Sequence, residues 1–279
     1  MGFKVKDSFF SVKDTLCCGQ IFRFSEENGI YQVISGDRLC YAKNENGFVF
    51  VDCLDADNEY FKNFFDLERD YSKIFNRAIS SNYEILVKSA TLGKGVRILN
   101  QDTIEMLFSF IVSQNNNIPR IKSIIEKLCR GLGEEKTFND KVFYAFPSIE
   151  KMASAPLSFY KEIGLGYRAE YILELAKNIS ENGFDLEALK SLSTLELERE
   201  LLKIKGVGKK VADCVLLFGF RRLDTFPVDT WIDKVYRENF MGKEIDRNKI
   251  SDYFVKLFNE DSGYFQQYLF YYKRSIENK

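Results

Sequence analysis

The chain has 279 residues, of which 45% are hydrophobic, and a formal net charge of −1. This length supports a substantial core divided among two or three subdomains. The near-neutral charge argues against nucleic-acid binding over the whole surface, so any such function must rest on a local basic region. No apolar run approaches membrane-spanning length, and the first ten residues lack the apolar segment of a signal peptide. We therefore expect a cytoplasmic protein without a membrane partner.

The cysteines and the absence of histidine limit the metal chemistry. The six cysteines are Cys17, Cys18, Cys40, Cys53, Cys129 and Cys214. They contain no C-x-x-C pair, and no cysteine follows Cys214, which argues against a zinc site and against a four-cysteine iron–sulfur cluster. We expect most of them to be small buried side chains in a reducing compartment, and we expect no cofactor.

The first third of the chain is rich in strand-forming residues. The runs YQVIS, LCYAK and FVFVD are aromatic and β-branched, and GD and NENG separate them as turns. This alternation predicts an antiparallel meander over residues 1–60. Residues 58–90 place aromatic and charged residues at helical spacing. We assign residues 1–100 to an N-terminal sheet domain with helices.

From Gln101 the pattern becomes helical. A helix is predicted over 102–114, with Asp102 as N-cap and Glu105 completing a capping box. A second is predicted over 120–130, ended by Gly131. Further helices are expected at 147–155, 168–180, 186–192, 194–204 and 263–275. The fold class is therefore α+β, with an N-terminal antiparallel sheet packed on a larger helical body over residues 101–279.

Residues 204–214, IKGVGKKVADC, form a glycine turn followed by an apolar helix. Gly206 and Gly208 permit positive φ and the close approach of another backbone or a phosphate. The first turn of the following helix presents unpaired N–H groups that bind an anion. With four lysines at 203, 205, 209 and 210, the segment predicts a phosphate clamp. The alternative is a helix-packing turn of an α-helical protein.

This segment resembles the helix–hairpin–helix of a DNA glycosylase superfamily, which continues with a Pro-x-Asp segment, here Pro227–Asp229. Within it, the chain is most similar to 8-oxoguanine DNA glycosylases over nearly its whole length. Four further stretches carry the resemblance: CCGQIFRF, SQNNNIPRI, GLGYRAEY and GYFQQYLFYY. The hairpin and catalytic helix fall at about 198–222.

Lys210 is the predicted nucleophile. An amine attacks a sugar carbon only when it is deprotonated. The positive helix end, the second ammonium of Lys209 and burial would each disfavour the charged amine. The resemblance also places the catalytic lysine at Lys210 and the catalytic carboxylate at Asp229, which is an N-cap by its position. Lys209 and Asp213 are expected to form a solvated ion pair.

The remaining site residues are implied by the resemblance. Gly19 offers its carbonyl to N7–H of the lesion, Gln266 reads the Watson–Crick edge, and Phe270 and Cys214 stack on the two faces of the base. Phe218 shares a helix face with Lys210 and Cys214 and is assigned to the base-binding pocket, although it stands where a methionine is common in the family. Asn115 fills the gap left by the flipped base, Arg120 and Arg168 read the opposite cytosine, and Tyr167 is the wedge. Gly206, Gly208 and Lys209 contact phosphate, and the carbonyls of Leu202, Ile204 and Val207 can hold a monovalent cation.

The resemblance implies a bifunctional DNA glycosylase/AP lyase that acts on duplex DNA containing an oxidised guanine. We expect a monomer, associated with the nucleoid if the source is bacterial. Two alternatives stay open. One is a non-catalytic helix–hairpin–helix scaffold that binds DNA, which would need neither Lys210 nor Asp229. The other is a glycosylase for a different modified purine.

Overall fold

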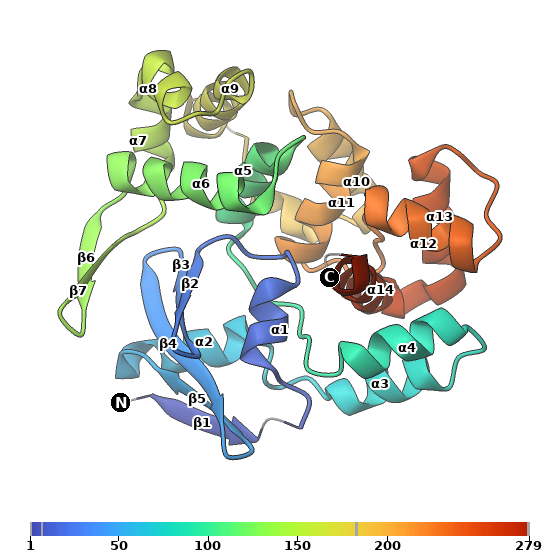
Figure 1. The fold of residues 1–279 in the computed structure, drawn as a ribbon. Helices are drawn as coiled ribbons and strands as arrows, with labels where there is room; N and C mark the ends of the chain where they lie inside the picture. The colour runs from blue at the N-terminus through green and yellow to red at the C-terminus, as the bar shows by residue number, and fades with distance from the viewer. Residues whose placement is uncertain (1, 7, 182–183, 278–279) are drawn as a thin grey trace.

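The computed structural model describes residues 2–6, 8–181 and 184–277. An N-terminal antiparallel sheet is followed by a larger helical body, which confirms the α+β class (Figure 1). The strands are β1 (Phe3–Lys6), β2 (Phe24–Glu27), β3 (Ile30–Ser35), β4 (Arg38–Glu45), β5 (Phe48–Asp52), β6 (Glu135–Phe138) and β7 (Lys141–Tyr144). The helices of the first half are α1 (Val12–Cys17), α2 (Asn58–Phe64), α3 (Tyr71–Ile79), α4 (Glu84–Leu92), α5 (Thr103–Ser113) and α6 (Ile118–Leu132).

The second half is helical. Its helices are α7 (Ile149–Ser154), α8 (Leu157–Glu162), α9 (Arg168–Glu181), α10 (Thr194–Leu202), α11 (Lys209–Phe218), α12 (Thr230–Asn239), α13 (Arg247–Phe258) and α14 (Ser262–Glu277). None of the helices in the described ranges is both long and apolar enough to cross a membrane.

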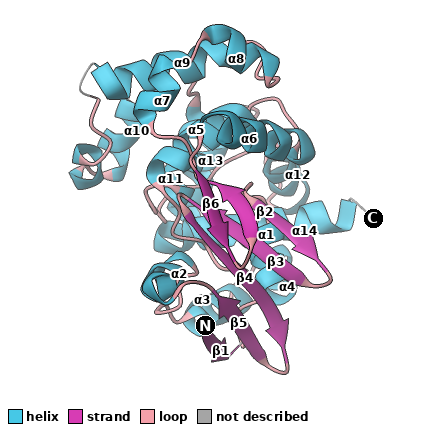
Figure 2. Cartoon of the chain, turned by 90° about the vertical axis from the view of Figure 1, so that its left-hand side faces the viewer, coloured by secondary structure: helices cyan, strands magenta, loops and turns pink. Residues whose placement is uncertain are grey.

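The five-stranded sheet has the order β1-β5-β4-β3-β2, with every pair antiparallel (Figure 2). The predicted meander is confirmed for β2 to β5, where consecutive strands are neighbours. It is interrupted by α1, which the sequence analysis missed. The Ser11 side chain caps this helix by accepting from the Asp14 N–H, and Val12 and Leu16 turn one face into the core.

The described residues form two main hydrophobic cores. One lies between the sheet, α1 and α2, and includes Val33, Val51 and Phe64. The larger core belongs to the helical body and also takes side chains from α3 and α4, of which α4 packs along α14 and α3 packs on α4. Helices α3 and α4 precede residue 100, yet their side chains pack in the core of the helical body. The two cores therefore do not separate at the predicted domain boundary.

The helix prediction over 186–192 is wrong. Only a short 3-10 turn forms, at Ala188–Ser191, because the Asp185 side chain accepts from the Glu187 and Ala188 N–H groups and Ser193 already caps α10. The β6–β7 hairpin was not predicted. Asn139 and Asp140 adopt φ of 49° and 57°, the left-handed pair that a two-residue hairpin turn requires.

Two predicted helix ends also differ. Helix α6 continues past Gly131 to Leu132, and Gly133 is its C-cap. Asp102 caps α5 as predicted, but the Glu105 carboxylate is buried and accepts from the Gly36 N–H and from Arg23, so the reciprocal half of the capping box is absent. This buried pair links the helical body to the sheet.

Candidate active site

A cavity of 940 Å³ opens where α11, α12 and α13 begin, beside the α5–α6 turn and α14. It brings together residues that are far apart in the sequence. The predicted site residues that line it are Gly19, Asn115, Tyr167, Gly208, Lys209, Lys210, Asp229 and Phe270. The predicted nucleophile and the predicted carboxylate thus face one space.

Lys210 lies in the first turn of α11 and is exposed, so the expectation that it is buried is wrong. Its ammonium lies 5.7 Å from the centroid of the Phe110 ring. Among the described residues, no carboxylate oxygen lies within 4.0 Å of this ammonium. Burial raises the pKa of the neighbouring Cys214 thiol to about 11, and the Lys210 charge opposes that rise. Lys210 also contacts the Cys214 thiol, but its exposed side chain lines the cavity and can meet a ligand there.

Asp229 is the N-cap of α12. Its Oδ1 accepts hydrogen bonds from the Trp231 and Ile232 N–H groups, both at 2.9 Å. Burial raises the pKa of this carboxyl above its usual value, while the helix N–H groups and the Lys210 charge oppose the rise. Capping therefore fixes the carboxylate at the cavity wall, with its second oxygen left out of the cap.

Lys209 is half-buried and its partner Asp213 is fully buried, so the prediction of a solvated ion pair is wrong. The Lys209 ammonium lies 2.6 Å from Asp213 and 3.2 Å from Glu198 of α10. Burial opposes the Lys209 charge, but the two carboxylates outweigh it and raise the pKa of Lys209. Burial also raises the pKa of Asp213 to about 7, although Lys209 and Ser251 donate to it. The structure does not favour phosphate binding by Lys209, because two carboxylates already hold its ammonium.

The other lysines of the predicted clamp are paired too. Lys203 contacts Glu200, and Lys205 contacts Glu174 of α9. Both pairs are exposed, and exposed pairs contribute little stability and exchange partners easily. Of the four lysines, Lys210 is the one without an acidic partner in the part of the chain that the structure describes.

The hairpin turn depends on Gly206. Its φ is +85°, and a Cβ there would lie 2.3 Å from the Tyr171 ring. Gly208 has φ of −92° and is the N-cap of α11, with no atom within 4 Å of the position its Cβ would take. Positive φ is thus confirmed at Gly206 but not at Gly208, where the glycine instead leaves the helix N-terminus open.

The α5–α6 turn is held in place by Arg168. This buried guanidinium donates to the carbonyls of Gln114, Asn115 and Leu165. Asn115 itself adopts φ of 44° and is exposed in the cavity. Arg120 is exposed and donates to the Gly164 carbonyl at 3.2 Å. The two arginines that were predicted to act alike therefore have different surroundings.

Two family models cover most of the chain. The 8-oxoguanine DNA glycosylase N-terminal domain matches residues 3–107, and the model of HhH-GPD superfamily base excision DNA repair proteins matches residues 108–260. The chain belongs to the HhH-GPD superfamily.

Relatives and solved structures agree with this membership. A probable N-glycosylase/DNA lyase of Methanothermobacter thermautotrophicus is 30% identical over 75% of this chain and 72% of the relative. The N-glycosylase/DNA lyase of Saccharomyces cerevisiae is 33% identical over 72% of this chain, which spans 56% of that protein. The DNA complex of the Clostridium acetobutylicum 8-oxoguanine glycosylase/lyase has a TM-score of 0.92 and 36% identity, covering 98% of this chain and 94% of that one.

In this HhH-GPD protein, three predicted base-binding residues lie behind the cavity wall. Cys214, Phe218 and Gln266 are buried, and the Gln266 amide donates to the Pro227 carbonyl at 3.1 Å. Phe218 stacks on Phe110 with 5.5 Å between ring centroids. Base contact by these residues stays a prediction, as does the cation at the carbonyls of Leu202, Ile204 and Val207.

Sequence reasoning did not assign several residues of the wall. Phe22 and Phe110 belong to its apolar part, and Trp231 and Arg247 lie near Asp229. Arg247 follows Asp246, which caps α13. An Asp-Arg pair before an apolar helical run was the signal that could have located this helix start. Five of the six cysteines are buried, as expected, and Cys17 is partly buried.

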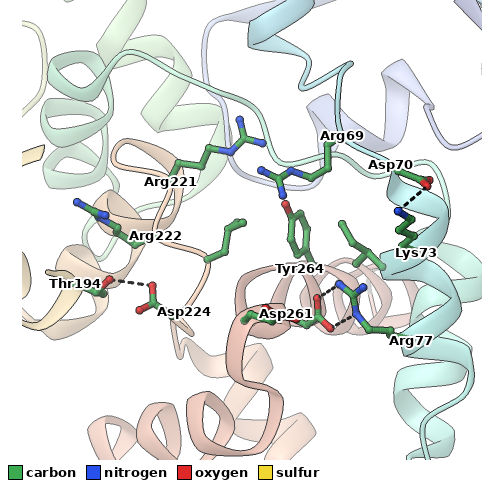
Figure 3. Close-up of a pocket in the computed structure, with 13 residues that line it drawn as sticks. Arg69, Asp70, Lys73, Arg77, Thr194, Arg221, Arg222, Asp224, Asp261 and Tyr264 are labelled. Atoms are coloured by element: carbon green, nitrogen blue, oxygen red, sulfur yellow. Dashed lines mark hydrogen bonds and ion pairs between the residues drawn. The ribbon is translucent and has the colours of Figure 1, made fainter. Parts of the chain in front are cut away.

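A second cavity, of 630 Å³, lies beyond the other end of α11 (Figure 3). Residues of α3 line one side of it, and residues of the helical body line the other. Its cations are paired within the protein. Arg77 binds Asp261, Arg69 and Arg221 both bind Asp66, and Arg222 donates to main-chain carbonyls. Five cationic and four acidic side chains line this cavity. With the carboxylate of Asp66, the positive and negative charges are equal in number. This cavity is an ion-pair network between chain segments and carries no ligand assignment.

Proposed function

We propose that the chain is a bifunctional DNA glycosylase/AP lyase that excises 8-oxoguanine from duplex DNA. The observation that carries the proposal is the placement of the Lys210 amine and the Asp229 carboxylate on one cavity, each at a helix N-terminus. Solved 8-oxoguanine glycosylase/lyases that bind DNA share the fold at 36% identity, which supports the same substrate class.

The chemistry follows from these two groups. The neutral Lys210 amine attacks C1′ of the flipped nucleotide, forming the N–C1′ bond as the C1′–N9 bond breaks. The electron pair leaves with the base, which takes up a proton. Asp229 stabilises the positive charge that develops on the sugar. Loss of the nitrogen proton and ring opening give a Schiff base. Removal of a C2′ proton then expels the 3′ phosphate and nicks the strand.

The DNA grip divides between two regions. The open N–H groups of α11, exposed by Gly206 and Gly208, bind a backbone phosphate. Asn115, Tyr167 and Arg120 enter the duplex and face the base opposite the lesion. Arg168 acts on the opposite base mainly by fixing the carbonyls of Gln114 and Asn115. The cytoplasm, with its nucleoid in a bacterium, is the location we expect.

A gel of singly modified duplexes tests this proposal. The substrates carry 8-oxoguanine, an alkylated purine, an abasic site or no lesion, each opposite every normal base. We expect nicking at 8-oxoguanine and at the abasic site, and loss of both with Lys210→Gln at retained binding. Binding without any nick would favour the scaffold alternative. Nicking at the alkylated purine in place of 8-oxoguanine would reassign the substrate.

A further inference from the structure

Arg274 is a charged side chain of the cavity to which the proposed chemistry gives no role. It lies on α14, four residues after Phe270 and eight after Gln266, so the three share one helix face. Its Nη2 donates to the Cys17 carbonyl, and its guanidinium carbon lies 5.2 Å from the Phe270 ring centroid. Arg274 is therefore fixed between the Gly19 segment and the ring predicted to stack on the base.

One donor of this guanidinium is left without an acceptor. Nη1 is buried and has no hydrogen-bond partner, and no carboxylate lies within 4.0 Å of Arg274 in the described ranges. A buried charged donor without an acceptor is costly, and native structures seldom keep one without a reason. A ligand that brings an acceptor to this point would remove the cost.

The orphan donor lies against Gly19. A Cβ on Gly19 would be 3.0 Å from Nη1 and 3.1 Å from Cε1 of Phe270. The Gly19 backbone, the Phe270 ring and the guanidinium thus meet at one place beside the cavity. Since φ of Gly19 is +88°, only glycine adopts this conformation without strain and leaves the contact open.

An oxidised guanine presents a matching edge. It carries a donor, N7–H, next to an acceptor, O8, whereas guanine offers only the N7 acceptor and a C8–H there. A backbone carbonyl beside a guanidinium donor complements the first edge and not the second. We propose that Arg274 is a specificity-determining residue whose Nη1 donates to O8 while the Gly19 carbonyl accepts from N7–H. This inference rests on the proposed function.

Single-turnover excision with two lesions tests the inference. One duplex carries 8-oxoguanine, and the other carries 8-thioguanine, which keeps N7–H but offers sulfur, a weak acceptor. The wild-type protein should prefer the oxo base. A lost hydrogen bond to a charged donor corresponds to about a 10- to 150-fold loss. Arg274→Leu should lose about this factor on 8-oxoguanine and much less on 8-thioguanine, so that the preference shrinks.

The controls separate this reading from a structural role. Arg237→Leu removes an exposed arginine of α12, paired with Asp233, and should keep the wild-type preference. If Arg274→Leu does not fold, Arg274→Gln is measured by the same ratio of the two lesions. An equal loss on both lesions would overturn the inference. Failure of the proposed function would look different, because the wild-type protein would then leave both lesions and an abasic duplex intact.

Discussion

Replacing Arg168 by leucine is expected to destabilise the protein, because the side chain holds the α5–α6 turn from inside. Its exposed fraction is 5%. Nε donates to the Gln114 carbonyl at 2.9 Å, Nη2 to Asn115 at 3.1 Å and Nη1 to Leu165 at 3.3 Å. Leucine fills part of the space but supplies no donor, so these carbonyls lose their partner.

A hydrogen bond to a charged group contributes about 1.5–3 kcal/mol, and bonds made by one guanidinium do not add fully. Water can reach the carbonyl of exposed Asn115 and recover part of the loss. We therefore expect Arg168→Leu to lower the free energy of unfolding by about 3 kcal/mol. Equilibrium unfolding in urea, followed by far-UV circular dichroism, measures this change.

Arg120→Leu is the matched control. Arg120 is exposed and makes one hydrogen bond, of 3.2 Å, to Gly164. Its loss should change stability by less than about 0.5 kcal/mol and reduce only the preference for cytosine opposite the lesion. If Arg168→Leu left stability within that same range and removed the cytosine preference alone, Arg168 would be a base reader, and its assigned role in holding the α5–α6 turn would be refuted.

Three further changes test other parts of the site. Because the pKa of Asp213 is raised to about 7, the folded protein holds a proton that the unfolded chain releases near pH 4. Stability should therefore fall as the pH rises from 4 to 7, and Asp213→Asn should flatten this slope in urea unfolding. Asp229→Asn keeps an N-cap oxygen, so it should cost less than about 1 kcal/mol of stability but slow single-turnover excision at least about 100-fold. Gly206→Ala should lower the free energy of unfolding by about 2 kcal/mol or more, since φ is +85° and Tyr171 blocks the Cβ, whereas Gly208→Ala should stay within about 1 kcal/mol. A Gly206→Ala protein as stable as wild type would contradict the hairpin geometry.

The sequence predicts the elements whose signals are local. The GVG turn, the Asp102 cap and the alternating strands of the meander all depend on residues within one or two turns of each other. The Ala188–Ser191 segment shows the limit of this reasoning. Its apolar spacing is helical, but the neighbouring Asp185 and Ser193 side chains redirect the backbone hydrogen bonds.

Long-range partners were not predictable. The spacing of Lys209 and Asp213 predicts their pairing, but it does not indicate the burial of Asp213 or the second carboxylate, Glu198, which reaches Lys209 only when α10 packs on α11. The burial of Arg168, the exposure of Lys210 and the orphan donor of Arg274 likewise depend on tertiary packing. The sequence predicts which residue types form the site. Only the fold shows which of the charged side chains have ion-pair or hydrogen-bond partners.

The central claim is that the Lys210 amine forms the covalent bond to the sugar. Borohydride reduction during the reaction traps a Schiff base, and peptide mapping locates the attached nucleotide. We expect the adduct on Lys210, its loss in Lys210→Gln and its persistence in Lys209→Gln. An adduct on Lys209, or one that survives in Lys210→Gln, would contradict the account.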